Sequence, residues 1–90
     1  MVDIKKSLRY HFVGIGGIGM SALAQITKSQ GHFVGGSDRR NDNRQTPEVF
    51  HKLESQGIRL FPQDGTGVDK KTDFIVISSA VEEDNPDLKI

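Results

Sequence analysis

Residues 8–21 read Leu-Arg-Tyr-His-Phe-Val-Gly-Ile-Gly-Gly-Ile-Gly-Met-Ser, and this stretch decides the fold. Its first six residues predict a strand that ends at Gly14. We expect a helix over residues 19–30, because four residues at i, i+3, i+4 and i+7 form one buried face: Met20, Leu23, Ala24 and Thr27. A strand that passes through a glycine-rich turn into a helix is typical of a βαβ unit.

The turn itself carries the pattern G-x-G-x-x-G at Gly14, Gly16 and Gly19, in the strand-to-helix context that this pattern requires. Gly14 permits a tight turn, Gly16 leaves room for a diphosphate, and Gly19 allows the helix to pack closely on the sheet. The free N–H groups and the positive end of the helix suit an anion. The alternative is a turn whose glycines serve packing alone, but Gly17 is a fourth glycine that packing does not need.

The rest of the chain alternates strands and helices. We expect strands over residues 32–35, 58–61 and 73–78, a helix from Thr46-Pro47 to Gly57 with Thr46 as its N-cap, and a further helix starting at Asn85-Pro86. Residues 37–45 and 62–72 are polar and predict loops. The apolar run of residues 74–77 is typical of a strand buried on both faces of a parallel sheet.

This alternation predicts an α/β domain spanning residues 1–90, with a Rossmann-like three-layer fold. Right-handed connections place about four parallel strands in the order 3-2-1-4. A ligand crevice is then expected at the carboxyl ends of strands 1 and 4, where the strand order reverses.

Asp38 follows the second expected strand, 19 residues after Gly19. An acid at this place accepts hydrogen bonds from ribose hydroxyls in dinucleotide-binding folds, and it can equally accept from the N–H of a uracil ring. A local turn made by the Asp side chain is the alternative. The arginines that follow, Arg39, Arg40 and Arg44, suit either a phosphate or a solvated loop.

Three small residues, Ser78, Ser79 and Ala80, end the fourth expected strand beside the predicted crevice. Small side chains there leave room for a flat ring, and the two hydroxyls can form hydrogen bonds with it. An ordinary turn at the strand end explains the same residues.

Composition excludes several classes of protein. The 12 Lys and Arg balance the 12 Asp and Glu, whereas nucleic-acid-binding domains typically carry a basic excess. There is no Cys, no apolar signal-peptide core and no run long enough for a membrane span, so we expect a cytoplasmic protein. The histidines His11, His32 and His51 have no metal-ligand spacing, and we expect each to be partly buried or exposed.

The chain resembles the Mur ligase family, the ligases that join amino acids to a muramate sugar. The resemblance extends from Arg9 to about Leu88. It rests on the run His-Phe-Val-Gly-Ile-Gly-Gly-Ile-Gly-Met-Ser of residues 11–21 and on three shorter stretches: Gly36-Ser37-Asp38, Ser78-Ser79-Ala80 and Asp84-Asn85-Pro86. Within the family, the members that add L-alanine are the most similar, and a ligase of peptidoglycan recycling that adds a tripeptide has the same N-terminal design.

The resemblance implies a three-domain enzyme whose N-terminal domain, this chain, holds the UDP part of UDP-N-acetylmuramate. It implies that the diphosphate is bound by Gly16, Gly17, Ile18, Gly19, Met20 and Ser21. It implies that the uridine is bound by Asp38, Arg39, Ser78, Ser79 and Ala80. ATP and Mg²⁺ would bind to a later domain, so this chain should contain no catalytic residue, metal or cofactor and should be inactive alone.

Two other classes of protein fit part of the pattern. The glycine fingerprint and Asp38 alone fit an NAD(P)-binding domain of a dehydrogenase or a sensor. A nucleotide-sensing or interaction module without partner domains also fits. Ser21 and the Ser78-Ser79-Ala80 stretch favour the ligase.

Overall fold

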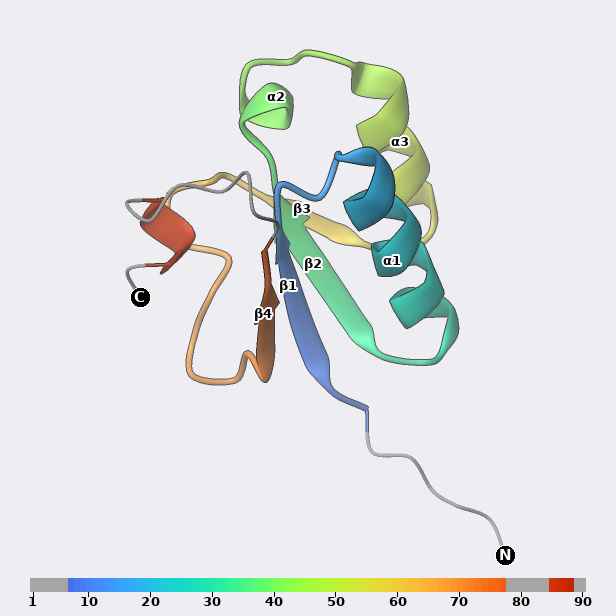
Figure 1. The fold of residues 1–90 in the computed structure, drawn as a ribbon, viewed down its shortest axis with the longest axis vertical. Coiled ribbons are helices and arrows are strands. Elements are labelled where there is room, and N and C mark those ends of the chain that lie inside the picture. Colours follow the sequence, from blue (N-terminus) through green and yellow to red (C-terminus); the bar gives the residue numbers. More distant parts are fainter. Residues whose placement is uncertain (1–6, 78–84, 89–90) are drawn as a thin grey trace, which may run out of the picture.

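The computed structural model describes residues 7–77 and 85–88 of the 90-residue chain. Its elements, in chain order, are β1 (Arg9–Val13), α1 (Ile18–Ser29), β2 (Phe33–Ser37), α2 (Arg39–Asp42), α3 (Pro47–Ser55), β3 (Arg59–Phe61), β4 (Phe74–Val76) and the 3-10 helix η1 (Pro86–Leu88) (Figure 1). The four strands form one sheet in the order β3-β2-β1-β4, and every neighbouring pair is parallel. The predicted fold class and strand order are confirmed.

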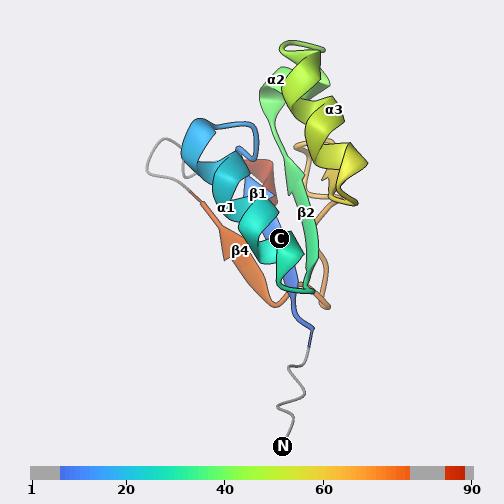
Figure 2. The ribbon, with the colours of Figure 1, turned by 90° about the vertical axis from the view of Figure 1, so that its right-hand side faces the viewer.

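The sheet separates two unequal layers. Helices α1 and α3 both lie on one face, in front of the strands in Figure 2. The link between β3 and β4, together with η1, lies on the other side of the sheet in Figure 1. Because the strands are parallel, all their carboxyl ends meet at one edge, and β1 leads from there through the glycine turn into α1.

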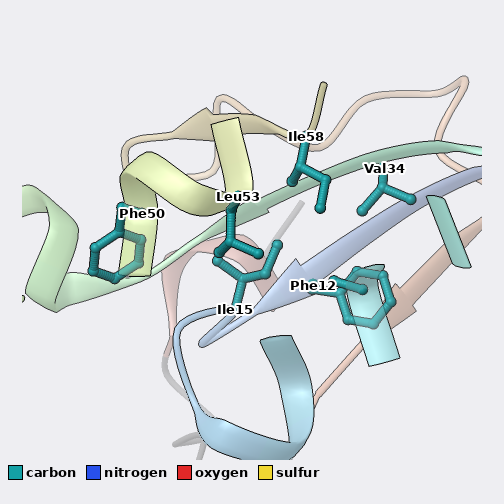
Figure 3. Close-up of a cluster of buried hydrophobic side chains, with 7 residues drawn as sticks. Phe12, Ile15, Val34, Phe50, Leu53 and Ile58 are labelled. Carbon is teal, nitrogen blue, oxygen red and sulfur yellow. The ribbon is translucent and has the colours of Figure 1, made fainter. Parts of the chain in front are cut away.

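The core lies between the sheet and the two long helices (Figure 3). It contains seven buried side chains from the sheet, the turn and both helices: Phe12, Ile15, Ala24, Val34, Phe50, Leu53 and Ile58. Ile15 belongs to the glycine turn itself and is fully buried. The packing of the core therefore fixes one residue of the turn directly.

The helix and strand faces differ from the expected pattern at two places. In α1, Ala24 and Thr27 are buried, but Leu23 is 45% exposed and lies off the buried face. In β4, Phe74, Ile75 and the following Ile77 are 49%, 41% and 48% exposed, so the expectation of a strand buried on both faces is wrong. The reason is that β4 is an edge strand: within residues 7–77 and 85–88 it pairs only with β1.

The expected loop over residues 37–45 is also wrong in part. β2 continues to Ser37, because Gly36 and Ser37 pair with β1 and β3 on both sides. A short helix, α2, then follows, with Asp38 as its N-cap. Thr46 does not cap α3 with its side chain, because it adopts a left-handed conformation with φ of 45°. Its carbonyl oxygen accepts a hydrogen bond from the Val49 N–H instead, at 3.2 Å.

The glycines of this region have distinct steric surroundings. A Cβ at Gly36 would lie 2.6 Å from Ile15 Cδ1 and 2.7 Å from the Phe12 carbonyl oxygen. Gly36 is therefore required where the turn packs on β2. A Cβ at Gly19 would meet no atom within 4 Å, so the expectation that Gly19 permits close helix–sheet packing is wrong.

We predict that Gly36→Ala lowers the free energy of unfolding by about 1–3 kcal/mol or more, because Ile15 and the β1 backbone must move. Gly19→Ala is the matched control, and it should stabilise the chain by up to about 1 kcal/mol, since Ala favours an exposed helical position over Gly. Urea unfolding followed by circular dichroism measures both. Equal effects of the two substitutions would contradict the packing described for Gly36.

Candidate functional site

The carbonyl oxygen of Ser37, the last residue of β2, binds the start of the glycine turn. It accepts hydrogen bonds from the N–H groups of Gly14, at 2.8 Å, and of Ile15, at 3.0 Å. Gly14 has φ of +78°, a conformation that glycine adopts without strain. The tight turn expected at Gly14 is confirmed, and it is attached to the carboxyl end of β2.

The turn leads into α1, and several backbone N–H groups at the start of this helix have no acceptor in the described residues. The Gly17 N–H bonds to the Gly14 carbonyl, and the Ser21 N–H is the first to bond back to Gly17. In the described part of the chain, the N–H groups of Ile18, Gly19 and Met20 have no acceptor. Unpaired donors and the positive end of the helix dipole together favour an anion at this place.

Asp38 is buried beside the turn, and both of its carboxylate oxygens are in use. Oδ2 accepts from the Gly16 N–H at 2.9 Å and from the Arg40 guanidinium at 3.1 Å, while Oδ1 accepts from the Arg40 N–H at 2.9 Å and from Arg40 Nε at 3.2 Å. Four donors fill the acceptor positions of a carboxylate. A uridine donor would therefore have to replace one of them, and the Arg40 side chain, 43% exposed, is the one that can move into solvent.

These contacts also set the ionisation of Asp38. Burial alone would raise the pKa of the carboxyl, but the hydrogen bonds from the Arg40 side chain and from the Arg40 and Gly16 amides outweigh it, so the pKa lies below its ordinary value. Asp38 therefore remains an anion and keeps hold of the Gly16 amide at neutral pH.

Gly16 and Gly17 serve different purposes in this geometry. A Cβ at Gly16 would lie within 3 Å of Phe50, Arg40 and Asp38, so the room at Gly16 is filled by the chain's own side chains. Gly17 is the N-cap of α1, with φ of −64° and ψ of 151°, a conformation open to any residue. The backbone at Gly17 therefore does not require glycine, and the nearest atom to a Cβ there is the Gly14 carbonyl oxygen at 3.5 Å.

The remaining predicted site residues divide into two groups. Arg39, exposed at the start of α2, donates from Nε to Gln63 Oε1 at 3.0 Å. Ser78, Ser79 and Ala80 lie outside the described residues. The structure thus brings together residues 16–21, Asp38 and Arg39 at the carboxyl edge of the sheet, and their contact with a nucleotide stays a prediction.

A buried polar cluster next to this edge was missed by sequence reasoning. Asp87 is fully buried, and its carboxylate accepts from His11 Nε2 at 2.9 Å, from the Ser37 hydroxyl at 2.5 Å and from the Gly65 N–H at 2.7 Å. The expectation for His11, a partly buried or surface residue, is wrong, because its ring packs under η1 against Asp87. The carboxylate lies between His11 and Ser37, so the three residues do not form a nucleophile–base pair.

A hollow on the described part of the chain lies apart from the turn. A hollow of about 460 Å³ is lined by residues of the first three strands, among them Arg9, Phe33 and Arg59, and by residues of the link between β3 and β4, among them Thr66 and Thr72. In residues 7–77 and 85–88 no three His, Cys, Asp or Glu side chains gather as metal ligands. None of the helices described is both long and apolar enough to cross a membrane.

A parallel sheet of order 3-2-1-4, whose first strand turns through glycines into a helix with free N-terminal amides, defines a Rossmann-like domain of the nucleotide-binding type. The family comparison is more specific. Residues 9–90 match the model of the Mur ligase family, catalytic domain, and the chain belongs to that family.

Several curated relatives carry the name UDP-N-acetylmuramate–L-alanine ligase. The protein of Acetivibrio thermocellus is 40% identical over 88 residues, which cover 98% of this chain. Those of Geobacter sp. and Synechococcus sp. are each 45% identical, over 89% and 88% of this chain. The chain spans only 16–18% of the length of these three relatives.

We predict that Asp38→Asn lowers the free energy of unfolding at pH 7 by about 1–3 kcal/mol, since charge-assisted hydrogen bonds to buried partners are lost. Because the folded pKa of Asp38 lies below the unfolded value of 3.8, its stabilisation is present above that value and is lost as the pH falls through the folded pKa.

Urea unfolding at several pH values measures this effect. The difference between the wild type and Asp38→Asn should shrink as the pH falls below about 4. Asp69→Asn, which removes an exposed carboxylate, is the control and should differ little from the wild type. A constant difference for Asp38→Asn across this range would show that its ionisation does not support the turn.

Proposed function

We propose that this chain binds the UDP part of UDP-N-acetylmuramate, as the N-terminal domain of an ATP-dependent UDP-N-acetylmuramate–L-alanine ligase of peptidoglycan synthesis. The observation that carries the proposal is the row of amides at Ile18, Gly19 and Met20, at the start of α1, which have no acceptor among the described residues. The substrate is inferred from membership of the Mur ligase family and from the names of the relatives.

The contribution of this domain is binding. The amides of residues 18–20 neutralise the diphosphate, aided by the Ser21 hydroxyl one turn into α1. Asp38 acts on the nucleotide chiefly by fixing the Gly16 amide, and directly only when Arg40 moves aside. We further propose that Arg39 binds the uracil and that Ser78, Ser79 and Ala80 contribute to binding of the uridine.

The chemical step belongs to parts of the enzyme outside this chain. ATP and Mg²⁺ activate the muramate carboxylate as an acyl phosphate, which the amine of the amino acid then attacks. The chain contains no G-x-x-x-x-G-K-[ST] phosphate loop, and its described residues offer no metal-ligand cluster. We therefore propose that this domain presents the substrate, in the cytoplasm, to an ATP-binding domain and an amino-acid-binding domain of the same protein.

Two alternatives are weaker. The NAD(P)-binding alternative is weaker because the chain belongs to the Mur ligase family and its curated relatives are named for UDP-N-acetylmuramate. The filled acceptor positions of Asp38 do not separate the two, since Arg40 would have to move aside for a ribose hydroxyl as for a uridine donor. A tripeptide ligase of peptidoglycan recycling has the same N-terminal design, and the names of the relatives favour the ligase that adds L-alanine.

An NMR titration tests the proposal against the NAD(P) alternative. UDP-N-acetylmuramate should shift the amide resonances of residues 18–20 at lower concentration than NADH does, because the chain belongs to the Mur ligase family and its relatives are named for this nucleotide sugar. Stronger binding of NADH, or no shift with UDP-N-acetylmuramate at millimolar concentration, would overturn the proposed function.

We predict that Gly17→Val abolishes this binding while the chain remains folded. The Gly17 backbone conformation accepts a valine, so the free energy of unfolding should change by no more than about 1 kcal/mol. The branched side chain would stand beside the free amides, which a diphosphate must approach to about 2.9 Å.

Thermal melts and the same titration measure both effects. The control is Ala22→Val, which adds the same branched side chain at an exposed position of α1 and should leave binding unchanged. A folded Gly17→Val chain with wild-type affinity would show that the diphosphate does not lie over the start of α1.

A further inference from the structure

Gln63 lies just beyond β3 and connects three segments at the carboxyl edge of the sheet. Its Oε1 accepts from Arg39 Nε at 3.0 Å and from Asn85 Nδ2 at 3.1 Å. Its Nε2 donates to the Ser37 hydroxyl at 3.2 Å, and its backbone N–H donates to Asp42 Oδ2 at 3.0 Å. Gln63 thus bonds to the end of β2, to both ends of α2 and to the segment that leads into η1.

The partners of Gln63 on the inner side are themselves fixed. Ser37 and Asn85 are buried, with exposed fractions of 1% and 4%. Ser37 donates to the buried carboxylate of Asp87, and Asn85 Oδ1 accepts from the Asp87 N–H at 3.0 Å. Buried groups with satisfied hydrogen bonds have one favoured arrangement. The amide of Gln63 is therefore set in place by the cluster around Asp87.

The outer partner, Arg39, is different, because its side chain is exposed and long. Nε is bonded to Gln63, whereas the two terminal nitrogens have no acceptor within residues 7–77 and 85–88. A glutamine is a neutral acceptor, so it orients the guanidinium without cancelling its charge. As far as residues 7–77 and 85–88 are concerned, both terminal NH₂ groups and the full positive charge remain available to a ligand at the carboxyl edge.

We infer that Gln63 is a positioning residue for nucleotide recognition: it orients Arg39 toward the ligand and is itself fixed by Ser37, Asn85 and Asp87. This inference rests on the proposed function, since Arg39 is the residue expected to face the uracil. Binding a ligand through a preoriented side chain avoids the entropy cost of ordering a free arginine, which is the physical reason for such an arrangement.

A double-mutant cycle tests the inference. Gln63→Met removes the acceptor but keeps the length of the side chain, and Arg39→Met removes the guanidinium. We expect each single variant to weaken binding of UDP-N-acetylmuramate by roughly tenfold, and the double variant to bind no more weakly than Arg39→Met alone. Titration calorimetry on the chain, with urea unfolding of each variant, provides the affinities and the stabilities.

The matched control is Gln56→Met. Gln56 also donates a side-chain hydrogen bond, to Gln25 Oε1 at 2.9 Å, but it joins the exposed C-cap of α3 to α1 and does not involve Gln63 or Arg39. We expect this variant to keep wild-type affinity. A purely structural role of Gln63 predicts instead that Gln63→Met lowers the affinity by the same factor in the wild type and in the Arg39→Met background, and this additivity would overturn the inference.

A second measurement covers the case in which Gln63→Met does not fold. In the wild type, UDP-N-acetylmuramate should shift the NMR resonances of the Arg39 Nε–H and of the Gln63 side-chain amide together. Unshifted resonances at saturation, with the amides of residues 18–20 shifted, would refute the inference and leave the proposed function intact. Absence of every shift would instead overturn the proposed function.

Discussion

The structure depends on one constraint: the end of β2 must supply the acceptors for the glycine turn that follows β1. The Ser37 carbonyl binds the amides of Gly14 and Ile15, and the Asp38 carboxylate binds the amide of Gly16. Three successive donors are thereby consumed and the Gly17 N–H bonds to Gly14, so in the described part of the chain the free donors begin at Ile18, at the N-terminus of α1. The position at which an anion can bind therefore depends on which amides of the turn are already bound to the end of β2.

The same two residues connect the turn to the opposite layer of the sheet. Ser37 presents its carbonyl to the turn and its hydroxyl to Asp87 and Gln63, while Asp38 presents its carboxylate to Gly16 and Arg40. Segments from residues 14 to 87 therefore meet at the end of one strand. In a domain of this size, such shared partners make the glycine turn and the core parts of a single cooperative unit.

The architecture could be predicted from local sequence patterns, whereas the contacts within the site could not. The alternation of strands and helices, together with the rule of right-handed connections, is enough to predict the order of the strands in the sheet. The glycines of residues 14–19 are enough to predict the position of the turn. The pairing of His11 with Asp87 joins residues 76 positions apart, and no periodicity indicates it. The intramolecular contacts of Asp38 were not foreseen for a related reason: its type and place predict a ligand contact, which stays a prediction, and only the geometry reveals that Arg40 and Gly16 donate to its carboxylate. The exposure of β4 was missed because an apolar run indicates a strand and does not indicate whether that strand lies at an edge.

The exposed β4 has a practical consequence for the isolated chain in solution. Phe74, Ile75 and Ile77 present apolar surface on a strand that, in the described residues, is paired on one side only. Unpaired strand edges with apolar side chains are templates for intermolecular pairing. Self-association through this edge would grow with protein concentration and with salt, whereas the carboxyl edge with its glycine turn lies at right angles to it and would stay open in such an assembly.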